Sequence, residues 1–232
     1  MELVLVRHAQ PQWYVDDVHQ GSDPKLSELG FEQAERLADE LEHEHFDEIL
    51  VSPLLRARQT VAPLLARLGR EEVIAPWLRE ITDPPIEGRS RNDVMALFEA
   101  EHLAPLDERW TGLPGGERID DFHERINGGV TEFLAHFGIG RHEHKVPSWT
   151  VTRGAPADVE GGPRVLCVAH GGTNAVVTAA LLGANRVPFE WFRFWYGHTT
   201  IGRLTARATS GIVYFALQGL ETPHLPKDMR TN

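Results

Sequence analysis

The chain has 232 residues, of which 41% are hydrophobic and 25% charged, as expected of a folded globular domain. Its 34 acidic and 23 basic side chains give a net charge of -11, which argues against general binding to nucleic acid or to an anionic membrane. No apolar run approaches the roughly 18 residues of a membrane span, and the N-terminus lacks a signal-peptide pattern. The single cysteine, Cys167, excludes an internal disulfide. We therefore expect one domain over residues 1–232, located in the cytoplasm.

Short apolar runs alternate with helical patterns in the first half of the chain. Ser27 has the side chain of a helix N-cap, and apolar residues recur at helical spacing behind it. Pro63 is expected to kink or end the next helix early, because proline removes a backbone hydrogen bond. In chain order, the predicted elements are a strand at 3–6, a helix at 27–42, a strand at 49–51, a helix that opens at Ser52-Pro53, a weak strand at 73–75 and a helix at 93–101.

The second half continues this alternation around one irregular stretch. Residues 141–162 are rich in proline, glycine and single charges, and we expect a loop insertion there. Gly128 and Gly129 weaken the middle of a predicted helix. The predicted elements are a helix at 120–137, a strand at 165–169, a helix at 174–182, and a hairpin of strands at 201–208 and 212–217 joined by 209–211.

The alternation of strands and helices with short loops predicts an α/β domain. We expect a three-layer α/β/α sandwich with a mainly parallel central sheet and helices on both faces. In such sheets the ligand lies beyond the carboxyl ends of the strands, so the residues that follow the strands are the candidates for function.

Basic and imidazole side chains follow three of the predicted strands. Arg7 and His8 follow the first, Arg56 lies just past the second, and His170 follows the strand at 165–169. Because parallel strands end at one edge of a sheet, these side chains would form a compact positive pocket. Arginine suits phosphate oxygens, and the glycines after His170 leave backbone N–H groups for an anion. The positive charges disfavour protonation of His8, which could then attack phosphorus as a neutral imidazole.

Seven short motifs occur in order between Leu3 and about Leu225. They are Arg7-His8-Ala9-Gln10; Gln20-Gly21 with Leu26-Ser27, Gly30 and Gln33-Ala34; Ser52-Pro53-Leu54-Leu55-Arg56-Ala57-Arg58-Gln59-Thr60; Leu78-Arg79-Glu80-Ile81 with Glu87-Gly88; Pro114-Gly115-Gly116-Glu117; Val168-Ala169-His170-Gly171-Gly172; and His224-Leu225. In this order they resemble the motifs of the histidine phosphatase superfamily, also called the phosphoglycerate mutase-like family.

The resemblance implies a role for individual residues. His8 would be the phosphorylated nucleophile and Glu80 the general acid and base. Arg7, Arg56 and His170 would bind the phosphoryl group that is transferred. Because fixed cations compensate its charge, no metal or other cofactor is expected. Further substrate-binding residues expected from the resemblance are Gln20, Gly21 and Gly171.

The implied function is metal-independent hydrolysis of phosphomonoesters through a phosphohistidine. The expected substrate is a small phosphorylated metabolite that the sequence does not identify, and a homodimer stays open. One alternative is a phosphoglycerate mutase of the same fold; another is a catalytically weak phospho-ligand-binding or interaction protein. A mutase of this family has a longer, basic segment soon after the acid motif, whereas the stretch from 92 to 107 here contains acidic residues and no lysine or arginine. That difference favours the phosphatase.

Two positions depart from the family pattern. Tyr14 stands where many members have asparagine, so one phosphate contact is in doubt. Asp83-Pro84-Pro85 replaces a stretch that commonly carries an aromatic residue and a glycine, which puts the loop beside Glu80 in doubt. The 141–162 stretch has no counterpart in the family core.

Two other chemistries are weaker candidates. Cys167 is not followed by an arginine six residues later, as a cysteine phosphatase requires, because Thr173 is there. A metallohydrolase would need the pairs His43/His45 and His142/His144 as ligands, but residues at this spacing point apart on a helix. We expect these four histidines to be exposed.

Overall fold

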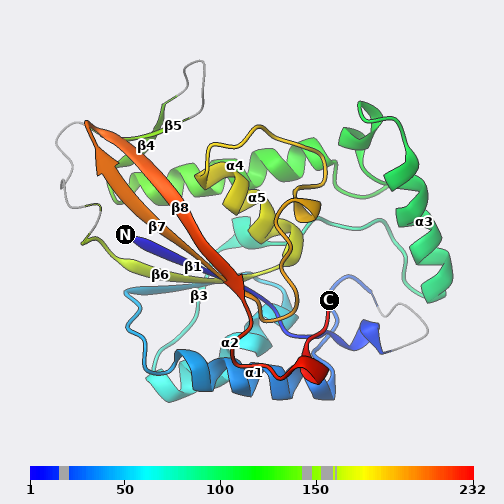
Figure 1. The fold of residues 1–232 in the computed structure, drawn as a ribbon. Helices are drawn as coiled ribbons and strands as arrows, with labels where there is room; N and C mark the ends of the chain where they lie inside the picture. Colours follow the sequence, from blue (N-terminus) through cyan, green and yellow to red (C-terminus); the bar gives the residue numbers. More distant parts are fainter. Residues whose placement is uncertain (16–20, 143–147, 153–158, 160) are drawn as a thin grey trace.

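The computed structural model describes residues 1–15, 21–142, 148–152, 159 and 161–232. Its strands are β1 (Glu2–Arg7), β2 (Glu48–Val51), β3 (Val73–Ile74), β4 (Ile139–His142), β5 (Ser148–Val151), β6 (Arg164–Ala169), β7 (Ile201–Thr209) and β8 (Ile212–Glu221). They form one eight-stranded sheet in the order β3-β2-β6-β1-β7-β8-β5-β4 (Figure 1).

Only half of this sheet is parallel. β3, β2, β6 and β1 run in one direction, whereas the pairs β1–β7, β7–β8, β8–β5 and β5–β4 are antiparallel. The expectation of a mainly parallel sheet therefore holds for the β3-to-β1 half and not for the other. The predicted hairpin accounts for the β7–β8 pair, because strands joined by a tight turn must be antiparallel. Ser210 and Gly211 form that turn with φ of 52° and 81°, as two-residue hairpin turns require.

Helices cover both faces of the sheet, which confirms the three-layer arrangement (Figure 1). Val4 and Val6 of β1 pack with the core of α1 and α2, while Leu3 and Leu5 pack on the opposite face with that of α4 and α5. α3 stands apart, on the side toward which the parallel strands run (Figure 1). No helix among the described residues is long and apolar enough to cross a membrane. The helices are α1 (Glu28–Leu41), α2 (Leu55–Leu68), α3 (Arg91–Leu103), α4 (Ile119–Ala135) and α5 (Gly171–Leu181), with 3-10 turns η1 (Gln12–Tyr14), η2 (Pro76–Leu78), η3 (Glu108–Thr111), η4 (Glu190–Phe192) and η5 (Lys227–Met229).

The first two helices show which local signals decide their ends. Ser27 caps α1 as predicted, and its hydroxyl accepts a hydrogen bond from the Gly30 N–H at 3.0 Å. Of the two effects predicted for Pro63, a kink or an early end, the early end is wrong, because α2 continues to Leu68 and is closed by Gly69 with φ of 62°. Proline removes only one helical hydrogen bond, and α2 keeps a buried apolar face that includes Leu64 and Leu65.

Part of the 141–162 stretch is regular structure. β5 lies within it and pairs with β8, and β4, which begins just before it, pairs with β5 at the edge of the sheet. Trp149 of β5 is 3% exposed and donates a hydrogen bond from Nε1 to the Ala180 carbonyl. These two strands were not predicted from the sequence, because each has only a short apolar pattern and lies among many turn residues.

The two glycines of α4 differ in their surroundings. A Cβ atom on Gly129 would lie 2.3 Å from Cγ of Trp77, whereas one on Gly128 would meet nothing within 4 Å. Gly129 therefore lets Trp77 pack directly on the backbone of α4, which is the reason the helix tolerates a glycine where the sequence analysis expected a weakness.

We expect Gly129→Ala to lower the free energy of unfolding by about 1–3 kcal/mol, because the buried ring has to shift. Gly128→Ala is the matched control, which should raise it by about 0.5–1 kcal/mol through helix propensity alone. Urea unfolding of both variants measures the difference. Equal effects of the two substitutions would contradict the packing described.

Candidate active site

The pairing of β1 with β6 places two histidines side by side. The strands are parallel with Arg7 opposite Ala169, and the His8 N–H donates to the Ala169 carbonyl at 2.8 Å. The ring centroids of His8 and His170 lie 5.1 Å apart. The expected meeting of these residues at one sheet edge is therefore what the structure has.

His8 is held in one tautomer. Its Nδ1 lies 2.7 Å from the Ala9 carbonyl oxygen, which can only accept, so Nδ1 carries the proton and Nε2 has the free lone pair. Arg56 Nε donates toward this Nε2 at 3.3 Å. Burial, followed by the charges of Arg56, His170 and Arg7, keeps the pKa of His8 well below its usual 6.5. His8 is thus a neutral imidazole with an available nitrogen.

Arg56 enters from the first turn of α2 and is 8% exposed. Its Nη1 donates to the Ser22 carbonyl at 3.1 Å and lies 3.7 Å from Asp23 Oδ1. Arg7 is oriented separately, since its Nη1 donates to the Tyr196 carbonyl at 2.7 Å. The two guanidinium groups therefore reach the His8 ring from different elements.

His170 forms a side-chain hydrogen bond with Ser52. Its Nε2 lies 2.7 Å from the Ser52 hydroxyl oxygen, which also accepts from the Leu54 N–H. When the hydroxyl donates to Nε2, the ring proton is on Nδ1, and this buried Nδ1 has no partner among the described residues. Burial, then Arg56 and Arg7, keep the pKa of His170 well below 6.5.

The Glu80 carboxylate sits at the N-terminus of α5. Its Oε2 accepts from the Gly172 N–H at 2.9 Å, and its Oε1 accepts from the N–H and the hydroxyl of Thr173. The Ile81 N–H donates to Oε1 at 3.0 Å. Free N–H groups and the helix dipole favour an anionic group at this position. Glu80 follows η2 in the chain, and its carboxylate is bound to the N-terminus of α5, the helix that His170 precedes. It lines the same cavity as His8.

An ion pair between Arg125 and Glu117 holds the segment that carries Glu80. Arg125 of α4 pairs with Glu117 through two hydrogen bonds of 2.9 Å and also donates to the carbonyls of Trp77 and Arg79. Glu117 Oε2 accepts from the Thr82 N–H at 3.0 Å. The loop with Pro114-Gly115-Gly116-Glu117 thus fixes Glu80 from the outside, and sequence reasoning missed Arg125 because nothing local marks it.

His198 is the other residue that sequence reasoning missed. It is 1% exposed and its ring centroid lies 5.6 Å from that of His8. Its Nδ1 lies 2.8 Å from the Thr231 hydroxyl, and its N–H donates to the Thr231 carbonyl. The following Thr199 has φ of 54°, an uncommon value for a threonine. No strand end or motif precedes His198, so only the fold brings it here.

These groups open into one cavity of about 370 Å³. Gly21 and Gly171, both expected to bind substrate, line it together with Arg7, His8 and Arg56. His170 lies behind it, and Gln20 falls outside the described residues, as does the side chain of Tyr14. Asp83, one of the departures from the family pattern, also lines the cavity. Burial, then the neighbouring Glu80, raise the pKa of Asp83 to about 6.

The other candidate chemistries have no geometric support in the described part of the chain. Burial raises the pKa of Cys167 to about 12, so its thiol is no nucleophile. The side chains of His43 and His45 are 86% and 85% exposed, as expected. No group of three His, Cys, Asp or Glu side chains converges there as a metal site. His144 falls outside the described residues, whereas His142 ends β4 and is exposed.

Comparison with known proteins agrees with this arrangement. The model of the histidine phosphatase superfamily (branch 1) matches residues 3–142. Phosphoserine phosphatase 1 of Hydrogenobacter thermophilus is 32% identical over 139 residues, which are 57% of this chain and 64% of that protein. A 2,3-bisphosphoglycerate-dependent phosphoglycerate mutase of Methylobacterium is 27% identical over 219 residues, 89% of this chain and 93% of that protein. The structure of mycobacterial glucosyl-3-phosphoglycerate phosphatase superposes with a TM-score of 0.71 at 28% identity, covering 94% of this chain and 97% of that one.

The buried imidazoles of His8, His170 and His198 link stability to pH. All three pKa values lie well below the 6.5 of an exposed histidine, so below about pH 6.5 the unfolded chain binds protons that the folded protein does not. We expect the free energy of unfolding to fall with decreasing pH, by up to about 1.4 kcal/mol per pH unit for each ring. Urea unfolding between pH 7 and 5 measures the slope.

Two variants serve as controls for that slope. His198→Asn should make it shallower, because one of the three rings is gone. Asp83 acts in the opposite sense, since its raised pKa makes the folded state bind a proton more readily than the unfolded chain. Asp83→Asn should therefore steepen the slope. A free energy of unfolding that stays constant from pH 7 to 5 in all three proteins would contradict the neutral histidine cluster.

Proposed function

Because this chain belongs to the histidine phosphatase superfamily (branch 1), we propose that it is a metal-independent phosphatase that hydrolyses phosphomonoesters through a phosphohistidine on His8. The observation that carries the proposal is the state of His8. It is a neutral ring with the proton on Nδ1 and with its Nε2 lone pair facing Arg56. A nucleophile toward phosphorus needs an unprotonated nitrogen next to charges that bind the phosphoryl oxygens, and the hydrogen bond from Arg56 to Nε2 gives way when Arg56 binds those oxygens.

In the first step, His8 Nε2 attacks phosphorus while the bond from phosphorus to the leaving oxygen breaks. Arg7 and Arg56 compensate the charge on the phosphoryl oxygens, and His170 donates to them from Nδ1, the atom that has no other partner among the described residues. Glu80, a carboxylate in the free site, first takes a proton from the monoanionic phosphate group of the substrate and then gives that proton to the leaving oxygen. The products of this step are a free alcohol, phospho-His8 and the Glu80 carboxylate.

In the second step, water replaces the alcohol. The Glu80 carboxylate takes a proton from that water, whose oxygen attacks phosphorus while the bond from phosphorus to Nε2 breaks. Inorganic phosphate leaves and His8 returns to the neutral ring, with its Nδ1–H still donating to the Ala9 carbonyl. Gly171 and Gly21 line the cavity close to these groups, which supports their role in substrate binding; for Gln20 that role stays a prediction.

The proposed substrate is a small phosphorylated metabolite, and the proposed location is the cytoplasm. A buried thiol at Cys167 is compatible with a reducing compartment. A homodimer stays a prediction from the sequence.

A phosphoglycerate mutase is the second candidate, because a Methylobacterium mutase is similar over most of its length. A mutase has to retain a displaced phosphoglycerate and exclude water from phosphohistidine. Among the described residues that line the cavity, the acidic Asp83 and Glu101 face the region beyond the arginines. They would repel the carboxylate of that intermediate, which supports the phosphatase.

We expect His8→Ala to lower phosphate release from p-nitrophenyl phosphate by about 10³-fold or more, since the covalent step is lost. His43→Ala, an exposed histidine outside the cavity, is the control and should act like the wild type. The wild-type protein quenched in alkali during turnover should carry phosphate that acid removes, and the His8→Ala variant should carry none. Near-wild-type release by His8→Ala would support the binding-protein alternative instead.

A second assay of the wild type distinguishes a phosphatase from a mutase. With 3-phosphoglycerate and catalytic 2,3-bisphosphoglycerate, phosphorus NMR should show no 2-phosphoglycerate, while other phosphomonoesters release phosphate. Rapid exchange of the 2- and 3-isomers with negligible phosphate release would overturn the phosphatase.

We expect Glu80→Gln to slow hydrolysis of an alkyl phosphate by about 10²–10⁴-fold and that of p-nitrophenyl phosphate much less, because a good leaving group needs less protonation. Steady-state kcat values for the two substrates measure the ratio. Glu87→Gln, on an exposed carboxylate of the same loop, is the control. Equal losses for both substrates in Glu80→Gln would show that Glu80 is not the acid.

A further inference from the structure

The cavity continues beyond the phosphate-binding residues into a second region, which we call the outer subsite. It is built from three elements that are not part of the parallel sheet edge: α3, the segment around η4 and the turn η1. Trp13, Met95, Phe98, Glu101 and Trp195 come from these elements, and Asp83 joins them from the loop that follows Glu80. Whatever alcohol is esterified to the phosphate has to occupy this region.

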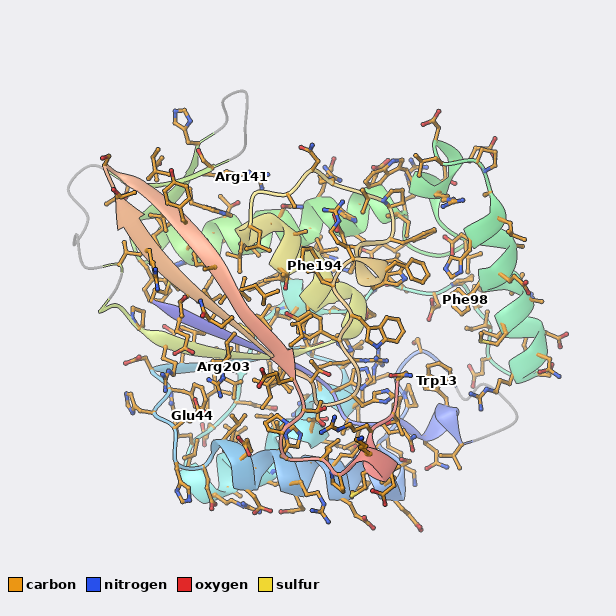
Figure 2. All side chains as sticks on the ribbon, viewed as in Figure 1. Trp13, Glu44, Phe98, Arg141, Phe194 and Arg203 are labelled. Atoms are coloured by element: carbon orange, nitrogen blue, oxygen red, sulfur yellow. The ribbon has the colours of Figure 1, made fainter. Side chains whose placement is uncertain are left out.

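The walls of the outer subsite are mostly aromatic and apolar. Phe98 lies on the side of α3 that faces the rest of the molecule, and Trp13 lies across from it (Figure 2). Met95 and Trp195 remain 55% and 52% exposed, although both line the cavity. Such side chains gain free energy when a ligand covers them.

α3 has almost no packed face of its own. Val94 is its one buried residue, whereas Met95 and Phe98 contribute to the cavity wall. An amphipathic helix of a globular protein normally buries a stripe of apolar residues against the core. In α3 that apolar material faces the space next to the phosphate site instead, which is continuous with the site and is open to a substrate.

The charges of the outer subsite are negative. Arg7 and Arg56 are the only lysine or arginine side chains among the described residues that line the cavity, and both lie at the phosphate end. Glu117 is neutralised by Arg125, but Asp83 and Glu101 have no such ion pair in the described chain. Burial raises the pKa of both carboxyl groups, and each is raised further by a neighbouring carboxylate: Glu80 for Asp83, and Asp83 for Glu101.

We infer that the outer subsite selects phosphomonoesters of aromatic or other bulky apolar alcohols that carry no negative charge, with Phe98 and the tryptophans binding the ring and Asp83 rejecting anionic leaving groups. This inference rests on the proposed phosphatase activity. The outer subsite would exclude alcohols that bear a carboxylate or a second phosphate. Such a group would lie against an apolar wall beside Asp83 and Glu101, with no cation to pair with.

The test compares phenyl phosphate with 3-phosphoglycerate. We expect kcat/KM of the wild type to be at least about 10²-fold higher for phenyl phosphate. Phenol is also the better leaving group, so the part of this ratio that is due to the outer subsite is the part that the variants below remove. Phe98→Ala should lower kcat/KM for phenyl phosphate by about tenfold, mainly through KM, and should change that for methyl phosphate little. Leu103→Ala, on an apolar residue of α3 that is 78% exposed and outside the cavity wall, is the matched control and should have no effect.

A second pair of variants tests how the negative charge of the outer subsite affects the choice of substrate. Asp83→Asn should raise the ratio of kcat/KM for 3-phosphoglycerate to kcat/KM for phenyl phosphate by about tenfold, because the anionic leaving group meets this carboxylate. Glu99→Gln removes one negative charge from α3 outside the cavity and should leave both values unchanged. Equal gains for both variants would show that net charge alone is responsible and would overturn the role of Asp83.

Failure of the inference and failure of the proposed function give different results. If 3-phosphoglycerate is hydrolysed as well as phenyl phosphate, with activity still lost in His8→Ala, the outer subsite is wrong and the phosphatase stands. If no phosphomonoester is hydrolysed, calorimetric titration of the wild type with the same two compounds decides. Binding of phenyl phosphate at least about tenfold tighter than 3-phosphoglycerate would support the subsite, and equal or reversed affinities would overturn it.

Discussion

The parallel pairing of β1 with β6 is the constraint on which the candidate site depends. With Arg7 opposite Ala169, both strands end at the same level, so His8 and His170 leave the sheet together. A shift of the register by one residue would turn alternate side chains to the other face and would mix the two cores, since Leu3 and Val4 belong to different layers. Burial of these apolar side chains therefore also fixes the geometry of the histidines.

The N-terminus of α5 is the second organising feature, because it positions both His170 and the Glu80 carboxylate. His170 is the residue that precedes the helix, and the first N–H groups bind the Glu80 carboxylate. The His170 ring and the Glu80 carboxylate are thus positioned by the same rigid element. The Arg125–Glu117 pair secures Glu80 from the other side, so that α4, which takes no direct part in the cavity chemistry, still determines where the carboxylate lies.

The inner part of the cavity is positively charged, whereas its outer part is negatively charged. At the strand ends, two arginines and three uncharged imidazoles make a buried positive centre, in which His8 has no hydrogen bond to a carboxylate of the described residues. Farther out, unpaired carboxylates and aromatic rings replace the cations. Attraction for one phosphoryl group and repulsion of a second anion are therefore built into the same cavity. An overall charge of -11 is no obstacle to phosphate binding, because the positive charge is local and buried.

The sequence by itself predicted the α/β class, most helix and strand positions, and the meeting of Arg7, His8, Arg56 and His170. It did so because apolar periodicity is a local property and because parallel strands place their ends at a common edge. Only the tertiary structure decided how the predicted hairpin joins β1 and β5 in the sheet, the strands β4 and β5 themselves, the continuation of α2 past Pro63 and the presence of His198 and Arg125 at the site. Each of these depends on contacts between segments that are far apart in the chain, such as His198 with Thr231 or Trp77 with Gly129. No local pattern of residues encodes a contact of that kind, so it becomes visible only when the chain is folded.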